Sequence, residues 1–442
     1  MKKLLMLCLI GFAVGNPVLI ESSYPMIGVN PEHRFQAPAP AQVNGLNWEF
    51  PVAISPLGGP ITVRHISDSL IDFVVFAGES APGHSFLYCL RANGGIHWRN
   101  SLPAPVKGFP AFSVINEQIV VSSGDSLISF HLISGSRFWA RRLMGNGWHP
   151  TIWHNIVVYA ADEAGYLSAY DLMTGSLGWR QGPLGGGLFN TTATVDSLGN
   201  VYVGTLGNQL QWYDWRVHFF DSLGNERRAP IEYLAFEPGG IRMTMALISL
   251  DKVVHHNYWQ TYWTCGVYGI SFQGVLWRYS PFDFQTKYSS IAFDGQKLYL
   301  GTSEGLLILD TLGNFIRLVP VGPITYSSPL IDSLGQILVG NDAGVFYILN
   351  SNGQIIFQYS TNTSPLGSAS IGLNGDIYIA GQTKLFCFTY QVGLTEEKTR
   401  QIVIKMVKSG EIYDILGRRV KGLLRRGIYF QDGDGKKKIV VR

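Results

Sequence analysis

Residues 327–357 read SSPLIDSLGQILVGNDAGVFYILNSNGQIIF, and this stretch decides the fold class. It contains four short apolar runs separated by three turns that each carry a glycine. Apolar residues alternate along the runs, as Leu307 and Leu309 do in the related stretch at 289–318. A period of two is the pattern of β-strands. The stretch therefore predicts four consecutive strands joined by tight turns.

This four-strand unit repeats along the chain, for example at 192–205 and 289–318. The glycine of the last turn of each unit falls at eight positions: Gly45, Gly95, Gly135, Gly175, Gly224, Gly274, Gly313 and Gly353. Consecutive glycines are 39 or 40 residues apart in four cases and 49 or 50 apart in three. A four-stranded unit with a period near 40 is typical of a β-propeller, in which ring closure buries both faces of every sheet. We therefore predict an all-β, eight-bladed β-propeller over residues 44–390.

The two ends of this region complete each other. Residues 44–50 (NGLNWEF) have the glycine and tryptophan of a fourth strand without three strands before them. Residues 368–390 supply three strands without a fourth. We therefore predict that the N-terminal strand closes the eighth blade, which removes an open sheet edge that would favour aggregation.

A pentapeptide, DSLGN, occurs at 196–200 and again at 221–225, and near-copies occur at 310–314 and 332–336. Two copies are expected to join strands one and two of a blade and two to join strands three and four, so all four lie on one face of the ring. Aspartate bonds neighbouring amides at a turn, and glycine supplies the positive φ of a tight hairpin. A calcium loop is the alternative, but it needs several oxygen ligands and each copy offers one carboxylate.

A tryptophan follows five of the turn glycines by three or four positions: Trp48, Trp98, Trp139, Trp179 and Trp277. Residues 169–179 (AYDLMTGSLGW) resemble the repeat of pyrroloquinoline-quinone (PQQ) type propellers, Ala-x-Asp-x-x-Thr-Gly-x-x-x-Trp, and 129–139 match it more loosely. The full match is carried by Ala169, Asp171, Thr174, Gly175 and Trp179. The resemblance implies that each such indole packs against the next blade, a burial that contributes about 2–3 kcal/mol per ring.

The best-known members of this family are quinoprotein dehydrogenases, which are eight-bladed and bind PQQ and calcium over the ring axis. The resemblance would imply the same chemistry here. However, the chain has no Cys-Cys pair, and the calcium ligands of that family cannot be matched to its residues. We therefore predict no catalytic residues, no cofactor and no metal, with a quinoprotein-like oxidoreductase as the alternative.

Other catalytic patterns are missing from the sequence as well. It has no G-x-S-x-G and no H-E-x-x-H, and residues 182–189 (GPLGGGLF) are expected to be a connector because no helix follows them. Four histidines lack a paired metal-ligand spacing, so we interpret them as strand-end residues rather than ligands. They are His149, His154, His255 and His256.

Two units carry aromatic insertions between strands two and three, at 207–217 (GNQLQWYDWRV) and 255–266 (HHNYWQTYWTCG). We expect both to protrude from adjacent blades 4 and 5, on the face opposite the DSLGN turns. Exposed aromatic loops commonly bind sugar rings or anchor a protein partner; the alternative is that these rings fold back over the blade edges. The predicted ligand-binding residues are Trp212, Tyr213, Trp215, Tyr258, Trp259, Tyr262 and Trp263.

The N-terminal segment 1–15 (MKKLLMLCLIGFAVG) has two lysines followed by eleven largely apolar residues. This pattern predicts a secretory signal peptide, because a spanning helix needs roughly 20 apolar residues. The mature chain would then have no transmembrane segment. Residues 16–43, which include APAPA, are expected to be an extended linker, and 391–400 a second linker.

The C-terminal segment is strongly basic, since residues 398–442 carry 13 Lys or Arg against 4 Asp or Glu, whereas the whole chain has a net charge of +3. Residues 410–442 resemble the C-terminal sorting domain of the type IX secretion system. The resemblance rests on Ile412, Tyr413, Asp414, Gly417, Arg418 and Val420, on GIYF at 427–430 and on KKKIVV at 436–441. The family's earlier motifs are missing or reduced to RQIVIKMV at 400–407, and the alternative for 401–442 is a small β appendage with a basic face.

Three cysteines lie outside the signal segment: Cys89, Cys265 and Cys387. They form either one disulfide with one free thiol or three buried thiols.

These features favour an exported, non-enzymatic propeller that binds a glycan or a protein at the cell surface. The sorting resemblance implies export machinery as a further partner and an extracellular or outer-surface location. The acidic propeller region argues against nucleic acid as a partner. The alternatives are the oxidoreductase above and a periplasmic scaffold similar to the propeller lipoprotein of outer-membrane barrel assembly.

Overall fold

The computed structural model describes backbone and side chains at 26–64, 72–114, 117–184, 191–205, 216–231, 245–256, 266–280 and 285–389, and backbone alone at 19–24, 65–66, 70–71, 232, 240–241, 257–258, 412–414, 428–433 and 436–441. These residues form strands, turns and loops. They include no helix, and therefore none of the length and apolar character that crossing a membrane requires. The chain divides into one unit of residues 1–391 and another of 392–442.

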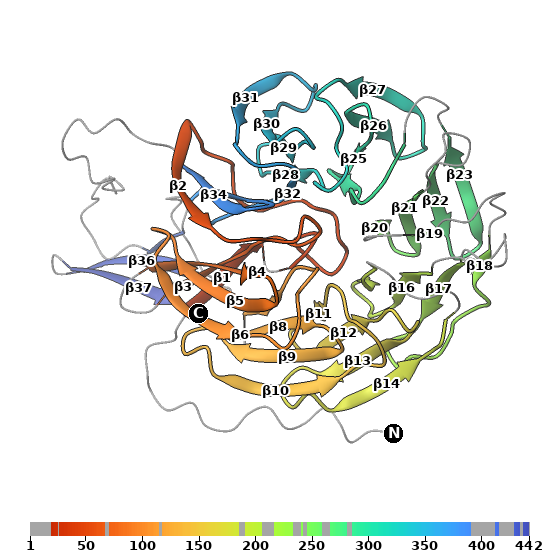
Figure 1. Ribbon diagram of the computed structural model, residues 1–442, viewed down its shortest axis with the longest axis horizontal. Helices are drawn as coiled ribbons and strands as arrows, with labels where there is room; N and C mark the ends of the chain where they lie inside the picture. The colour runs from red at the N-terminus through yellow and green to blue at the C-terminus, as the bar shows by residue number, and fades with distance from the viewer. Residues whose placement is uncertain are drawn as a thin grey trace. The chain divides into compact units, whose positions relative to one another are not determined.

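The first unit is a ring of eight antiparallel sheets, which we call blades 1–8 in chain order (Figure 1). Blades 1 and 2 are built, from the first strand outward, of β3 (Ile61–Ile66), β4 (Leu70–Ala81), β5 (His84–Arg91), β6 (Ile96–Ser101) and of β7 (Ala111–Ser113), β8 (Gln118–Ser123), β9 (Ser126–His131), β10 (Arg137–Arg142). Blades 3 and 4 are built of β11 (Thr151–Trp153), β12 (Val157–Ala161), β13 (Leu167–Asp171), β14 (Leu177–Gln181) and of β15 (Thr194–Val195), β16 (Val201–Gly204), β17 (Arg216–Phe220), β18 (Ile231–Glu232). The eight-bladed propeller is as predicted.

The remaining blades follow the same order. Blades 5 and 6 are built of β20 (Ala246–Ser249), β21 (Lys252–Tyr258), β22 (Gly266–Ser271), β23 (Gly274–Tyr279) and of β24 (Ala292–Phe293), β25 (Lys297–Gly301), β26 (Leu306–Asp310), β27 (Phe315–Val319). Blades 7 and 8 are built of β28 (Leu330–Ile331), β29 (Ile337–Gly340), β30 (Val345–Leu349), β31 (Ile355–Ser360) and of β32 (Leu366–Ile371), β33 (Ile377–Gly381), β34 (Lys384–Thr389), β2 (Gly45–Pro51). Two further strands join these sheets. β1 (Leu19–Tyr24) pairs with β3 in blade 1, and β19 (Gly240–Ile241) pairs with β21 in blade 5.

The ring is closed by the N-terminal strand. β2 pairs antiparallel with β34, from Gly45 opposite Thr389 to Pro51 opposite Lys384. An ion pair between Lys384 and Glu49, with a 2.5 Å contact, joins the same two strands. The prediction that residues 44–50 complete the eighth blade is confirmed, and the strand order makes the first and last blades neighbours.

The four pentapeptides are hairpin turns, as predicted. At residues 196–200, the Asp196 carboxylate accepts the backbone N–H groups of Leu198 and Asn200, both at 2.9 Å, and Gly199 has a φ of 83°. The copies at 221–225, 310–314 and 332–336 repeat these bonds. Two copies join first to second strands and two join third to fourth strands, so the aspartates are used in chain reversal.

The outer-strand tryptophans dock on the next blade. The Trp139 indole N–H donates to the Leu172 carbonyl at 2.9 Å, and its ring lies so close to Gly175 that a Cβ there would be 2.7 Å away. The other four rings make the same approach to a turn glycine: Trp48 to Gly94, Trp98 to Gly135, Trp179 to Gly224 and Trp277 to Gly313. Blade 1 uses Gly94, not Gly95, as its positive-φ residue.

Three of the eight junctions have another side chain in place of the indole. Between blades 7 and 8, the Phe357 ring packs on Phe388, with ring centroids 6.2 Å apart. Between blades 4 and 5, the Arg228 guanidinium lies over the Phe272 ring, 5.7 Å from its centroid, and bonds the Phe272 carbonyl. Between blades 6 and 7, the Val319 side chain takes the place beside Gly353. The buried apolar clusters lie between adjacent blades in the same way, so the core is divided among the blade interfaces.

Residues 26–43, expected to be an extended linker, pack against the first strands of blades 4–8; we call them the axial belt. Backbone bonds link the belt to five blades in turn: Val195 N–H to Pro31 O, Leu247 N–H to Glu32 O, Phe293 N–H to Arg34 O, Ile331 N–H to Phe35 O and Gln42 N–H to Gly375 O. Met26, Ile27, Val29 and Phe35 of the belt are buried, as are the three alanines of APAPA. The small alanine side chains let this segment approach the strands closely. The composition of the segment does not by itself predict this packing.

The second unit contains a small antiparallel sheet. Its strands are β35 (Ile412–Asp414), β36 (Ile428–Gly433) and β37 (Lys436–Val441). β36 pairs with both neighbours.

Candidate functional site

The two aromatic insertions connect second to third strands. Residues 206–215 join β16 to β17 in blade 4, and 259–265 join β21 to β22 in blade 5, at the strand ends opposite the DSLGN turns. Tyr258 ends β21, where its backbone pairs with Gly240. The other predicted ligand-binding residues lie outside the described part of the chain: Trp212, Tyr213, Trp215, Trp259, Tyr262 and Trp263.

A buried histidine stands on β17, the strand that follows the first insertion. The His218 ring stacks on Phe220, with centroids 6.1 Å apart, and its Nδ1 is 3.4 Å from a Glu226 carboxylate oxygen. Burial lowers the pKa of His218, while Glu226 acts in the opposite direction. The His218 imidazole therefore contributes to the packing around β17.

His255 and His256 are adjacent on β21 and point to opposite faces of the blade. The His255 ring stacks on Tyr268, with centroids 5.4 Å apart, and burial lowers the pKa of His255 to about 3. His256 Nε2 lies 2.5 Å from the Ser289 carbonyl of blade 6. The two rings do not converge on a common point.

The other two histidines considered in the sequence have separate surroundings. His149 Nδ1 accepts the backbone N–H of Phe109 at 3.0 Å, and the His154 ring lies 4.3 Å from Trp153 between centroids. Within the described ranges, no three His, Cys, Asp or Glu side chains gather closely enough to hold a metal ion.

Two cysteines, Cys89 and Cys387, are buried free thiols. Burial raises the pKa of both thiols, which makes them poor nucleophiles. Cys265 lies outside the described residues.

Hydroxyl side chains link the starts of the first strands around the axis. The Ser290 amide donates to Ser328 Oγ, and the Ser328 amide donates to Ser368 Oγ, both at 2.9 Å. Thr151 and Thr192 hydroxyls bond each other at 2.6 Å across blades 3 and 4. Sequence reasoning missed these residues. The sequence contains a pattern that could have identified three of them. Ser290 in SSIAF, Ser328 in SSPLI and Thr192 in TATV each lie two residues before the first residue that pairs with the second strand of the blade.

The axial belt fills the space beside these first strands. Ile27 and Phe35 are 0% exposed, and both ring nitrogens of His33 lie 2.9 Å from carbonyl oxygens, those of Ile27 and Ala193. Burial lowers the pKa of His33 to about 4, against the opposing effect of these carbonyls. The ring is thus neutral near pH 7, and the belt packs against the ends of the first strands beside the DSLGN turns.

PQQ with calcium needs room over the axis and several free oxygen ligands. Two described carboxylates on the face opposite the DSLGN turns already accept hydrogen bonds. Asp162 accepts the amides of Met144 and Ala164, and Asp342 accepts the amide and hydroxyl of Thr325. Because no three possible metal ligands gather within the described ranges, this donor set does not fit a PQQ–calcium centre.

An open groove of about 590 Å³ runs between blades 1 and 2. Its floor contains the buried side chains of Ile128 and Phe130, and Arg137 stands at its rim. An apolar floor with a polar rim is typical of ligand and peptide grooves.

Comparison with known proteins gives the type of propeller. Residues 73–181, which span parts of blades 1–3, match a family model described as "Outer membrane protein assembly factor BamB". No curated protein matches the chain.

Solved structures extend the likeness to the ring as a whole. BamB from Moraxella catarrhalis is 14% identical, with a TM-score of 0.56, over 78% of this chain and 99% of that one. A europium-containing methanol dehydrogenase is 15% identical, with a TM-score of 0.58, over 81% of this chain and 89% of that one. The quinohemoprotein alcohol dehydrogenase from Comamonas testosteroni is 12% identical, with a TM-score of 0.64, over 88% and 83%. The chain therefore has an eight-bladed propeller whose fold is similar to those of BamB and of these dehydrogenases.

Proposed function

We propose that this chain is an exported, non-enzymatic propeller that recognises a protein partner or a glycan through the second-to-third strand connections of blades 4 and 5. The contacts would be made by the seven aromatic residues predicted above. The observation that supports the non-enzymatic part is the state of the polar groups near the axis: Asp162, Asp342 and the interblade hydroxyls already bond groups of the chain itself. Recognition is then left to the connections at the strand ends.

A binding experiment tests the contact surface. Glycan arrays and pull-downs from envelope extracts should give a specific ligand for the full chain, and Trp259→Ala with Trp263→Ala should weaken its binding. Phe138→Ala, which removes an aromatic ring that is 50% exposed on blade 2, is the control and should bind normally. Equal binding by all three proteins would remove the two indoles as the site.

A reconstitution experiment tests the enzymatic alternative. Incubation with PQQ and calcium should leave the absorbance spectrum of the cofactor unchanged and give no dye-linked alcohol oxidation. A shifted spectrum with activity would establish the oxidoreductase instead.

The BamB match favours a second candidate, a periplasmic scaffold for other envelope proteins. The proposed sorting role of residues 401–442 separates the two. Cell fractionation with sequencing of the mature C-terminus should find the protein outside the outer membrane. Retention in the periplasm with an intact tail would support the scaffold.

A further inference from the structure

A tyrosine recurs in the middle of the second strand in four blades: Tyr159, Tyr202, Tyr299 and Tyr378. In blades 4 and 6 its hydroxyl donates to the aspartate that begins the preceding turn, Tyr202 to Asp196 at 2.9 Å and Tyr299 to Asp294 at 2.7 Å. A buried hydroxyl needs such a partner, because leaving it unpaired costs free energy.

Blade 8 lacks the aspartate. Tyr378 pairs with Ser370 across β32 and β33, as Tyr202 pairs with Thr194 across β15 and β16. The position that Asp196 occupies is therefore Gly372. Apart from a weak interaction with the Cys387 thiol, the Tyr378 hydroxyl has no hydrogen-bond partner among the described residues, although the residue is 1% exposed.

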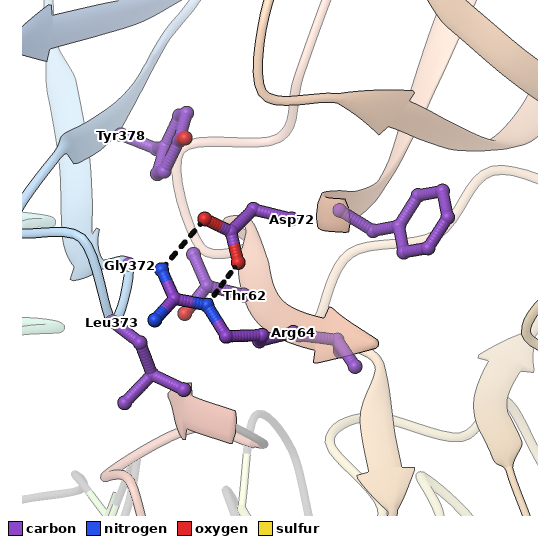
Figure 2. Close-up of a pocket in the computed structure, with 8 residues that line it drawn as sticks. Thr62, Arg64, Asp72, Gly372, Leu373 and Tyr378 are labelled. Carbon is purple, nitrogen blue, oxygen red and sulfur yellow. Dashed lines mark hydrogen bonds and ion pairs between the residues drawn. The ribbon is translucent and has the colours of Figure 1, made fainter. Parts of the chain in front are cut away.

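A small cavity lies where that carboxylate would be (Figure 2). Its volume is about 10 Å³, and it is lined by Thr62, Val63, Arg64, Asp72, Phe73, Gly372, Leu373 and Tyr378. Blade 1 supplies the opposite wall, where Arg64 holds the Asp72 carboxylate with two bonds of 2.6 and 2.8 Å. Tyr378 and Gly372 come from blade 8, so the cavity sits in the seam between the first and last blades.

We propose that this cavity binds one ordered water molecule, which accepts the hydrogen of the Tyr378 hydroxyl and donates to the Asp72 carboxylate. A buried water needs a cavity volume of roughly 10–15 Å³ and two to four polar partners. The volume here is about 10 Å³, and Tyr378 and Asp72 are two polar residues that line the cavity. A cation is disfavoured because the Arg64 guanidinium lines the same wall. The nearby Asp376 carboxylate is engaged by Asn374, at 2.5 Å, and by Thr389, so it does not take the place of the missing aspartate.

A crystal structure of the full chain that resolves ordered solvent tests the site directly. Density within hydrogen-bond distance of both Tyr378 Oη and an Asp72 oxygen is expected. In Gly372→Asp the new carboxylate should displace it and bond Tyr378, as Asp196 bonds Tyr202. A cavity without density in the unaltered protein would overturn the proposal.

Unfolding equilibria give an independent test. If water satisfies the hydroxyl, Tyr378→Phe should leave the equilibrium constant for folding unchanged or lower it. If the hydroxyl is dry, the same change should raise that constant by roughly five- to 100-fold, because an unpaired buried group is removed. Tyr202→Phe is the reference for a hydroxyl with a partner and should lower the constant, since it removes one of the hydrogen-bond donors to the buried Asp196 carboxylate.

Discussion

The carboxylate of Asp332 is shared between a turn and the axial belt. One oxygen accepts the backbone N–H of Ala41 at 2.8 Å, and the other accepts those of Leu334 and Gln336 at 2.8 and 2.7 Å. Asp332 is 1% exposed, whereas the Asp221 carboxylate, among the described residues, accepts hydrogen bonds only from Leu223 and Asn225 of its own turn.

The two aspartates should therefore differ in their contribution to stability. Asp332→Ala should lower the free energy of unfolding by about 2–3 kcal/mol, because the buried Ala41 N–H loses its acceptor together with the turn bonds. Asp221→Ala removes exposed local bonds and should cost about 1 kcal/mol. Urea unfolding of both variants measures the difference. Equal losses would show that the belt contact contributes nothing.

Alanine substitutions at the glycines of two pentapeptide copies should also differ in their effect on stability. Gly224 and Gly335 both have positive φ, 82° and 75°, so alanine strains either turn by about 1 kcal/mol. A Cβ on Gly224 would additionally lie 2.6 Å from the Trp179 ring, whereas nothing lies within 4 Å of one on Gly335. Gly224→Ala should cost at least about 2 kcal/mol more, because the docked indole must move. Thermal unfolding that gives both variants the same loss would contradict this docking role.

His33 should make the propeller sensitive to acid. Its pKa is lowered by burial from 6.5 to about 4, so the unfolded chain takes up a proton that the folded chain excludes. Stability is therefore full above pH 6.5 and falls as the pH drops toward 4, by about 3 kcal/mol in total. Urea unfolding at several pH values should show this fall.

Substitutions of single histidines test which side chain causes the acid sensitivity. His33→Gln should be less stable at pH 7 but should lose part of the dependence between pH 6.5 and 4. The remainder is expected from His255, whose pKa is lowered to about 3, and from His218, whose pKa burial also lowers. Replacing His84, which is exposed at the start of β5, should change neither stability nor slope. An unchanged slope in His33→Gln would place the acid sensitivity elsewhere.

The repeat was readable from the sequence because each blade is specified locally. A turn glycine and a tryptophan a few residues later, such as Gly175 and Trp179, fix the third and fourth strands, and the incomplete units at the two ends indicate closure. The connections that carry the aromatic insertions were located for the same reason, since β16, β17, β21 and β22 are local hairpins.

The belt was not readable, because its burial depends on five blades that are distant in sequence. APAPA contains two prolines, which lack a backbone N–H for sheet pairing, and no large side chain, and the Asp332 contact that holds Ala41 spans 291 residues. The seam cavity has the same origin: Gly372 is an ordinary turn residue until it is compared with Asp196 in the corresponding turn.

The clasp and the belt can be separated by rearranging the chain. Deleting residues 16–51 removes both and leaves β34 as an open edge, so we expect oligomers held by edge pairing. Because Gly45 lies opposite Thr389, residues 45–51 can instead be attached behind residue 389 through a short Asn-Gly turn, which restores β2 without the belt.

This permuted chain, beginning at residue 52, should be monomeric by light scattering but less stable than the natural chain, because it lacks the belt contacts of Phe35 and Ala41. The deletion chain is the comparison for association, and the natural chain is the comparison for stability. Oligomers of the permuted chain would show that the belt, and not the pairing of β2 with β34, keeps the ring closed.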